Sequence, residues 1–379
     1  MKRREVLIAG PAALTGALSL GFPAVHAQSL QVVKFGQSAS LTGGQAAYGK
    51  DVRDGIAAAF AAASRVDAGK NGVRYELLSL DDGGTRERCL QNVKSLVDAG
   101  VAGIVGLTSG AAAEAALPMI EDAQIVMLGT ATGNMGIRAA NHSSPYHVRA
   151  GYDEEYRRMV SYINAFGVER VGYVSLSDTS PANSQAMSNA LTSVGVKVTT
   201  AVKLDRNAKD FNAESEELVK ANLGCILFTT NEGPFTQIVR KTSALGYRGL
   251  YFSSSFAGQS AIDAMASMGQ SVIVASVVPR PTQVGLPVVK RCQDCLAALG
   301  TGTRLGFTSI EGFIAGQVAV EAARNAAKGG TAVTRGRFRE VLASTRTDLG
   351  GYKVDFVGSR NGSRFVDVIA VDRSGRLIG

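Results

Sequence analysis

Hydroxyl and glycine residues follow two consecutive apolar segments of this sequence, and their chemistry is that of a binding site. The segments are 101–106 and 125–128. The residues that follow them are Thr108, Ser109 and Gly110 in the first case and Thr130, Ala131 and Thr132 in the second. Hydroxyl groups and free backbone N–H groups hold a carboxylate or another oxygen-rich group, and the positive end of a following helix strengthens that contact. Because such groups do not break covalent bonds, the pattern predicts solute binding and not catalysis.

The common catalytic signatures are absent from the sequence. It contains no G-x-S-x-G nucleophile elbow, no G-x-x-x-x-G-K-[ST] phosphate loop and no G-x-G-x-x-G after the first apolar segment. His142 and His147 share one short stretch and are predicted to be loop or packing residues rather than bases. Asp81 and Asp82 could form an acid–base pair or bind a cation, but a strand-end turn with a helix cap fits them better. We therefore expect no enzymatic activity, no metal site and no other cofactor.

Alternating strands and helices must position these loops. An apolar strand is predicted at 32–36, and the helix after it carries Val52, Ile56 and Phe60 on one face at four-residue spacing. The same alternation continues along the first part of the chain and restarts over 171–252. In open α/β sheets, ligands lie outside the carboxyl ends of the strands, where the hydroxyl residues stand here. We therefore predict an α/β fold with two similar lobes.

The chain is expected to pass between the two lobes more than once. No low-complexity tract or long linker separates them, and the sequence ends in β-like segments at 353–357 and 365–371. Breaks near 148–152, 278–281 and 348–351 mark three predicted crossings. The predicted boundaries are 28–149 plus 279–349 for the first lobe and 150–278 plus 350–379 for the second.

Residues 1–27 have the composition of an export signal peptide. A basic start precedes the mostly apolar segment 6–20, and an A-x-A pattern ends at Ala27. The segment is too short and too interrupted to span a membrane, which takes about 20 residues. Two adjacent arginines fit either the general secretory route or the twin-arginine route. Both routes predict cleavage before Gln28 and a periplasmic location.

Composition narrows the class of protein further. Hydrophobic residues make up 45% and charged residues 19% of the chain, which suits a globular protein with a core. Tryptophan is absent and aromatic residues make up 6%, so stacking platforms for nucleic acid are not expected. The net charge of +8 is scattered along the chain, which favours a solvated surface. We expect a monomer that binds a small molecule and no nucleic acid.

The cysteines are predicted to have no framework role. Four are too few for a disulfide scaffold, and the chain after the leader has too few histidines to complete a zinc site. Cys225 lies in an apolar run and is predicted to be a small buried side chain. Cys292 and Cys295 form a C-x-x-C pair inside a helical pattern, and a disulfide between them stays an open alternative.

A series of short motifs carries a family resemblance. The motifs are Leu41-Thr42-Gly43 with Tyr48-Gly49, Leu80-Asp81-Asp82, Gly106-Leu107-Thr108-Ser109 and Ser309-Ile310-Glu311-Gly312-Phe313. In this order they cover essentially the whole chain after the leader. The chain resembles the leucine/isoleucine/valine-type periplasmic substrate-binding proteins of ABC transporters. The resemblance implies two Rossmann-like lobes joined by three hinge strands, with the ligand enclosed between them.

The resemblance also implies roles for individual residues. The loops 108–110 and 130–132 would hold the carboxylate of the ligand, and Tyr48 would supply an aromatic contact from the first lobe. Tyr152 and Asp153 would line the cleft where the second lobe begins.

Three positions depart from the amino-acid binders of that family. Asn231 stands at a usual aromatic position, and another second-lobe aromatic is replaced near Ser180-Pro181. Ser255 ends a serine run where the family carries the carboxylate that meets the ligand ammonium. An amino-acid ligand would then need a charge from Asp153, Asp178 or Glu232. An organic acid, aliphatic or aromatic, fits equally well.

The resemblance implies an extracytoplasmic receptor that captures a small organic solute and delivers it to the permease of an ABC transporter. The solute is expected to be an amino acid or an organic or aromatic acid. A ligand-binding sensor module for a signalling partner is the alternative, since it would have the same fold.

Overall fold

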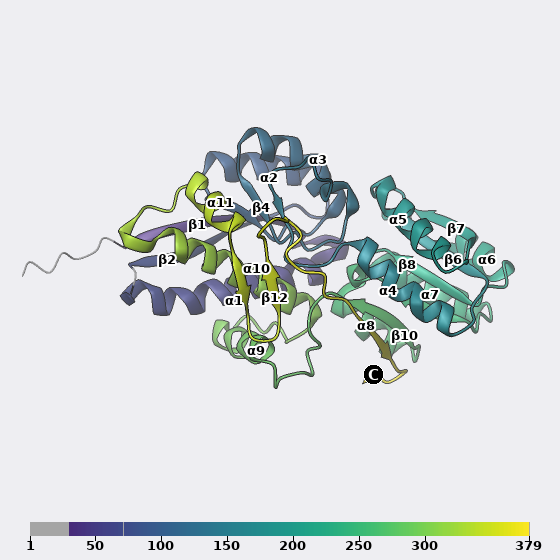
Figure 1. The fold of residues 1–379 in the computed structure, drawn as a ribbon. Coiled ribbons are helices and arrows are strands. Elements are labelled where there is room, and N and C mark those ends of the chain that lie inside the picture. Colours follow the sequence, from purple (N-terminus) through teal and green to yellow (C-terminus); the bar gives the residue numbers. More distant parts are fainter. Residues whose placement is uncertain (1–29, 71, 379) are drawn as a thin grey trace, which may run out of the picture.

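The computed structural model describes residues 30–70 and 72–378, which form two α/β lobes side by side (Figure 1). The predicted export signal at 1–27 lies outside the described residues. The first lobe contains a five-stranded parallel sheet in the order β2-β1-β3-β4-β5. Its strands are β1 (Gln31–Ala39), β2 (Val73–Asp81), β3 (Gly103–Val105), β4 (Val126–Leu128) and β5 (Pro145–Tyr146). Phe35 and Ala39 of β1 are fully buried, as expected for a parallel strand covered on both faces.

Helices flank this sheet on two sides, with α2 and α3 on one side and α1 and α10 on the other (Figure 1). The first-lobe helices are α1 (Ala46–Lys70), α2 (Arg86–Asp98), α3 (Gly110–Asp122), α9 (Pro287–Leu299), α10 (Phe307–Ala326) and α11 (Arg335–Ala343). Short 3-10 turns lie at Gly43–Gln45, Met135–Ile137 and Lys328–Gly330. The motif Ser309-Ile310-Glu311-Gly312-Phe313 lies in α10, which begins two residues before it.

Glycine allows α1 and α10 to pack backbone against backbone. A Cβ atom on Gly55 would lie 2.2 Å from the Ser309 carbonyl oxygen, and one on Gly312 would lie 2.2 Å from the Val52 carbonyl oxygen. Both distances are far below van der Waals contact, so only glycine fits there. This contact holds the N-terminus of α10 close to the first β-α unit.

The second lobe repeats the architecture around a seven-stranded sheet in the order β14-β13-β10-β9-β8-β6-β7. Its strands are β6 (Val171–Leu176), β7 (Val198–Leu204), β8 (Cys225–Thr229), β9 (Leu250–Ser253), β10 (Val272–Ser276), β13 (Asp367–Val371) and β14 (Leu377–Ile378). Its helices are α4 (Tyr152–Ala165), α5 (Pro181–Thr192), α6 (Asn212–Lys220), α7 (Glu232–Ala244) and α8 (Gly258–Ser267), and a 3-10 turn covers Ser255–Ala257. The central strands run parallel, whereas β13 and β14 add antiparallel pairs. The predicted α/β fold with two Rossmann-like lobes is confirmed.

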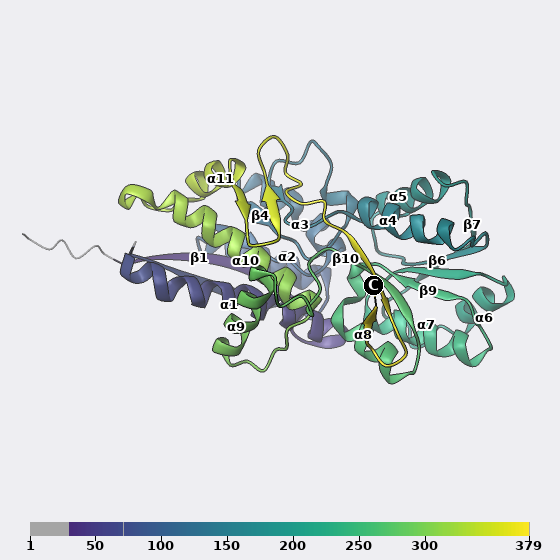
Figure 2. The same ribbon diagram turned by 60° about the horizontal axis from the view of Figure 1, so that its bottom comes forward.

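Three chain segments connect the lobes. The first leads from β5 to α4, the second leads from β10 to α9, and the last carries the chain to β13, as Figures 1 and 2 show. Before the last crossing, β12 (Lys353–Asp355) pairs with β11 (Arg346–Asp348), and the Gly362 N–H donates to the His147 carbonyl oxygen at 2.8 Å. The lobe boundaries predicted from the sequence stay a prediction, since pairing alone does not divide the chain between lobes.

Two further observations on the described residues concern membrane-spanning helices and cysteines. Within 30–70 and 72–378, none of the helices has the length and apolar content to cross a membrane. All four cysteines in this part of the chain are free, including Cys292 and Cys295, and the first of this pair is buried.

Candidate functional site

Loops from both lobes enclose a small cavity, which we call the interlobe cavity. The empty space between its atoms, open solvent included, is about 280 Å³. The described residues that line it are Gly110, Ala111, Thr132, Asn134, Tyr152, Thr179, Asn183, Arg206, Thr229 and Phe256. Several of them stand at the carboxyl ends of parallel strands, where ligands of α/β sheets bind.

The N-terminus of α3 forms part of the first-lobe wall. The Ser109 hydroxyl caps this helix by accepting a hydrogen bond from the Ala112 N–H at 3.3 Å, which leaves Gly110 and Ala111 at the wall. Gly110 has to be small, because a Cβ atom there would lie 2.8 Å from Thr132 Oγ1. The first N–H groups of a helix have no partner inside the helix and carry partial positive charge. This wall therefore favours an anionic group.

Thr132 and Tyr152 meet where the chain enters the second lobe. Thr132 Oγ1 accepts a hydrogen bond from the Asn134 N–H at 3.2 Å and lies 3.4 Å from the Tyr152 hydroxyl. The Tyr152 ring stacks on Tyr156 with centroids 5.6 Å apart, which fixes its position at the start of α4. Burial raises the pKa of the Tyr152 phenol, so the hydroxyl stays protonated and can donate to a ligand.

Three of the residues predicted to bind the ligand, Gly110, Thr132 and Tyr152, line the interlobe cavity. The cavity lining does not include the other predicted residues, which are Tyr48, Thr108, Ser109, Thr130, Ala131, Asp153, Asn231 and Ser255. The structure gives most of these a supporting contact, and their contact with a ligand stays a prediction.

Tyr48 and Thr108 tie the first-lobe loops to one another. The Tyr48 hydroxyl donates to the Ala131 carbonyl oxygen at 2.8 Å, and its ring meets the Phe256 ring edge-on with centroids 6.2 Å apart. Thr108 Oγ1 accepts a hydrogen bond from the Ser40 N–H at 3.1 Å. These contacts fix the loops behind the cavity wall.

Thr130, Asn231 and Asp153 differ in their surroundings. Thr130 and Asn231 are buried, and within the described residues Thr130 Oγ1 and Asn231 Oδ1 have no hydrogen-bond partner. Such unpaired buried atoms cost free energy, so each could accept a contact during ligand binding or lobe motion. Asp153 instead pairs with Arg157 at 3.1 Å on the solvent side of α4.

A buried ion network, which we call the Arg149 network, was not predicted from the sequence. It joins Arg149 at the first crossing to Glu155 of α4 and Glu311 of α10. Arg149 Nη1 donates to Glu311 Oε1 at 3.0 Å, and Arg149 Nη2 donates to Glu155 Oε1 and, at 2.6 Å, to Ser255 Oγ. Ser255 completes the network by donating its N–H to Glu155 Oε2 at 2.8 Å and its hydroxyl to Oε1 at 3.0 Å.

Charge and burial explain why the Arg149 network is complete. The three charged side chains are at most 6% exposed, so each ion needs a partner. Burial alone would lower the pKa of Arg149, but Glu311 and Glu155 raise it, and the guanidinium stays charged. Burial raises the pKa of Glu155, although Arg149 and Ser255 stabilise its ionised form. No sequence motif links these positions, because the fold alone brings them together.

Arg206 supplies a cation on the second-lobe side of the cavity. Its Nη2 donates to Asp178 Oδ1 at 2.8 Å, and its side chain is 13% exposed. In the part of the chain that the structure describes, Arg206 Nε has no hydrogen-bond partner. The cavity wall therefore carries a guanidinium with an unused N–H donor.

The two lobes are joined by hydrogen bonds at the rim of the interlobe cavity. Asn183 Oδ1 accepts from the Met135 N–H at 2.8 Å, and the Ser180 hydroxyl donates to Glu114 Oε1 at 3.2 Å. These contacts link Asn183 of α5 to the 3-10 turn Met135–Ile137 and Ser180, the N-cap of α5, to α3. The structure therefore shows the lobes closed over the cavity.

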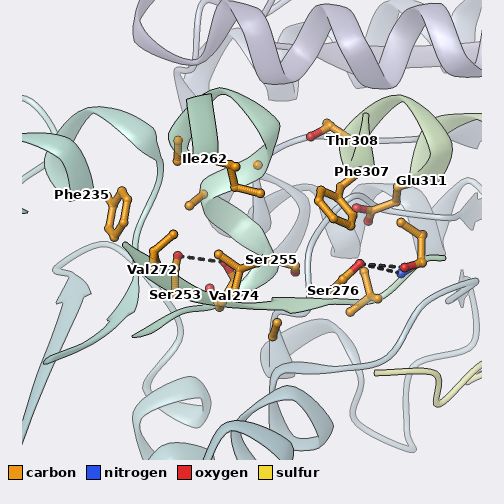
Figure 3. A pocket seen from close by; sticks show the side chains of 17 residues that line it. Phe235, Ser253, Ser255, Ile262, Val272, Val274, Ser276, Phe307, Thr308 and Glu311 are labelled. Carbon is orange, nitrogen blue, oxygen red and sulfur yellow. Dashed lines mark hydrogen bonds between the residues drawn. The ribbon is translucent and has the colours of Figure 1, made fainter. Parts of the chain in front are cut away.

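A second, apolar cavity lies between β9, β10, α8 and the N-terminus of α10, and its empty space, open solvent included, is about 460 Å³ (Figure 3). Phe307 and Glu311 of α10 stand at one end of it and Phe235 of α7 at the other. Its wall includes Ser255, so it adjoins the Arg149 network. Because most of its wall is aliphatic or aromatic, it suits an apolar group better than a charged one.

Metal ligands do not cluster in the described chain. Among residues 30–70 and 72–378, no group of three or more His, Cys, Asp or Glu side chains could hold a metal ion.

Two α/β lobes with a polar cavity between them define a two-lobed solute-binding protein. A family model described as "Periplasmic binding protein" matches residues 32–370, so the chain belongs to the periplasmic binding protein family. The resemblance inferred from the sequence motifs is confirmed. A comparison with curated proteins finds no match to this sequence.

Solved structures of similar proteins agree with this assignment. A possible leucine/isoleucine/valine-binding protein from Rhodopirellula baltica SH 1 has a TM-score of 0.85 at 22% identity, covering 93% of this chain and 97% of that chain. A substrate-binding periplasmic protein from Ralstonia solanacearum has a TM-score of 0.82 at 25% identity, covering 91% and 99%. A branched-chain amino acid ABC transporter from Thermus thermophilus with bound valine has a TM-score of 0.80 at 17% identity, covering 92% and 95%.

Proposed function

We propose that this protein is an extracytoplasmic receptor that captures a small organic solute between its lobes and presents it to the permease of an ABC transporter. The observation that carries the proposal is the interlobe cavity, whose wall combines hydroxyl, amide and guanidinium groups from both lobes. A solute held there touches both lobes at once. A permease that recognises the closed arrangement then distinguishes the loaded receptor from the free one.

Hinge closure is the proposed mechanism. The three crossings form the hinge, and closure brings Asn183 and Ser180 into hydrogen bonds across the rim. A solute favours the closed arrangement only by the affinity that it gains there. Contacts to Thr132 on the first lobe and Arg206 on the second would supply that gain, because only the closed arrangement presents both.

The relatives support a solute-binding role for this chain. The Thermus thermophilus structure holds valine, which makes amino acids one candidate class of solute. Organic acids are the other candidate class, and the charges at this chain's own cavity bear on the choice between the two.

We also propose that the chain is exported and cleaved before Gln28. The predicted leader and the family assignment support this proposal. N-terminal sequencing of the protein from a periplasmic extract should start at Gln28. A periplasmic protein that starts elsewhere would refute the cleavage site, and a protein found only in the cytoplasm would refute export.

A solute screen tests the receptor function. The protein that begins at Gln28 is screened by thermal shift against amino acids, organic acids, aromatic acids, sugars and polyamines, and each positive result is measured by isothermal titration calorimetry. We expect one class to raise the melting temperature and to bind with one site per chain. If no solute of any class binds, the proposed function is wrong.

A matched pair of variants ties binding to the interlobe cavity. Gly110→Val places side-chain atoms against Thr132 and should weaken the best solute at least about tenfold, because it fills the cavity wall. Gly336→Val is the control, since a Cβ atom there meets no atom within 4 Å and the residue also lies in the first turn of a helix. Equal affinity of the two variants would place the site elsewhere.

A further inference from the structure

The charges around the interlobe cavity are unevenly distributed. Among its described lining residues, Arg206 is the one cation, and none carries a carboxylate. Tyr152 is the other ionisable residue at the wall, and burial raises its pKa so that it stays neutral. A solute that enters the cavity therefore meets hydroxyl groups and the guanidinium of Arg206, which Asp178 pairs from outside the wall, and it meets no carboxylate among the described lining residues.

The carboxylates of the surrounding elements already have partners. Glu155 accepts from Arg149 and from both donors of Ser255, and Glu311 accepts from Arg149. Asp178 pairs with Arg206 itself. An ammonium group in the cavity would have to take a carboxylate from one of these partners, and an unpaired buried cation costs several kcal/mol.

Glu114 and Asp153 do not reach the cavity wall either. Glu114 lies one turn into α3 and is not among the lining residues, and its two oxygens accept from the Asn134 side-chain amide at 3.0 Å and from the Ser180 hydroxyl at 3.2 Å. Asp153 pairs with Arg157 towards solvent. Glu232 begins α7 and is not among the lining residues.

The same wall offers several donors that suit a carboxylate. Gly110 and Ala111 place the first N–H groups of α3 there, and the hydroxyl groups of Thr132 and Tyr152 stand beside them. Arg206 Nε has no partner within the described chain. Charge-assisted hydrogen bonds between a guanidinium and a carboxylate are stronger than neutral ones. Binding of an anion would thus satisfy a donor that is otherwise left unpaired.

We propose that the solute is an organic acid that carries a carboxylate and no ammonium group. The carboxylate binds between the N-terminus of α3, Thr132 and Arg206, and the rest of the solute contacts the rings of Tyr152 and Phe256. This inference rests on the proposed receptor function and goes beyond it by naming the class of solute.

The test uses pairs of compounds that differ only by the amino group. The pairs are L-leucine and 4-methylpentanoate, L-phenylalanine and 3-phenylpropanoate, and L-glutamate and glutarate, measured by calorimetry within a wider panel of acids, amines and sugars. In each pair that binds, we expect the compound without the amino group to bind at least about tenfold more tightly, and the tightest ligand of the panel to be a carboxylate without an ammonium group.

Variants of the wall complete the test. Arg206→Gln should weaken the best acid at least about tenfold, and Arg206→Lys should retain part of the affinity. Arg170→Gln on the same lobe is the control, since the Arg170 guanidinium donates to the carbonyl oxygens of Ala221 and Asn222 and is not among the residues that line the cavity. Melting temperatures without solute separate a binding defect from a folding defect.

The outcomes distinguish this inference from the receptor function. If an amino acid, an amine or a sugar is the tightest ligand, or if Arg206→Gln binds the best acid as well as Arg170→Gln does, the inference is overturned and the receptor function stands. If nothing in the panel binds, the receptor function fails, and the inference fails with it.

Discussion

Replacing Arg149 by methionine should destabilise the protein strongly at neutral pH and less in acid. The substitution keeps much of the side-chain volume but removes the one cation of the Arg149 network. Glu155 keeps its two contacts with Ser255, whereas Glu311 loses its charged partner. Removal of one partner from a buried ion network costs about 3–5 kcal/mol, so we expect a loss of about 4 kcal/mol in the free energy of unfolding at pH 7.5.

The dependence on pH follows from the two glutamates. Without Arg149, both carboxyl groups are buried without a cation, so their pKa values in the folded variant rise above those in the unfolded chain. A carboxyl group whose pKa is higher in the folded state lowers the free energy of unfolding as the pH rises through that folded pKa. At a pH where the group is protonated in both the folded and the unfolded state, it has no such effect. The loss caused by Arg149→Met should therefore shrink to about 2 kcal/mol at pH 5.

Urea unfolding followed by far-UV circular dichroism measures this effect at both pH values. Arg157→Met is the control, because its pairs with Asp153 and Glu154 are half exposed and should be worth about 0.5 kcal/mol or less. A variant that also carries Glu155→Gln and Glu311→Gln should recover at least half of the loss, since no buried charge is left unpaired. A loss below about 1 kcal/mol, or an equal loss at both pH values, would refute the role of charge in the network.

Three further predictions concern single positions. Burial and the neighbouring carboxylate of Asp54 raise the pKa of Asp51 to about 6. The contribution of Asp51 to the free energy of unfolding is therefore fully present below the unfolded pKa near 4 and is lost as the pH rises through 6. Asp51→Asn should stabilise the protein by about 1–2 kcal/mol at pH 8 and not at pH 4, measured by thermal unfolding. Gly312→Ala should cost about 2–3 kcal/mol in urea unfolding, because its Cβ atom would lie 2.2 Å from the Val52 carbonyl oxygen. Asn183→Leu should weaken the best solute by about 1 kcal/mol in calorimetry, because closure then leaves a rim N–H without its partner.

Two of these predictions have a control variant in the same chain, and the control for Asp51→Asn is its own measurement at pH 4. Gly69 lies at the exposed end of α1, and a Cβ atom there would meet no atom within 4 Å. Because alanine favours the helix more than glycine does, Gly69→Ala should stabilise the protein by up to about 1 kcal/mol. Asn189 lies on the same helix as Asn183, and its side chain accepts a hydrogen bond from Gln185 within that helix. Asn189→Leu should therefore leave solute affinity unchanged. Equal effects in a variant and its control, or a gain from Asp51→Asn that is the same at pH 4 and pH 8, would contradict the reasoning.

The fold class and the general position of the site could be predicted from the sequence. Periodic apolar segments predicted strands and helices in alternation, and hydroxyl residues after two strands predicted the edge where Gly110 and Thr132 line the cavity. These features are local, because strand periodicity, helix starts and loop chemistry are encoded within a few residues of one another. The ordered motifs also indicated the family, which the family model confirms.

The distribution of charge in the site could not be predicted from the sequence and emerges from the folded structure. Arg149, Glu155 and Glu311 come together across three elements, and Arg206 reaches the cavity from the loop after β7. Asp153, which the sequence offered as a charge for the ligand, pairs with Arg157 instead. Pairing between buried ions depends on distances between residues far apart in the chain, and a single sequence contains no pattern that encodes those distances.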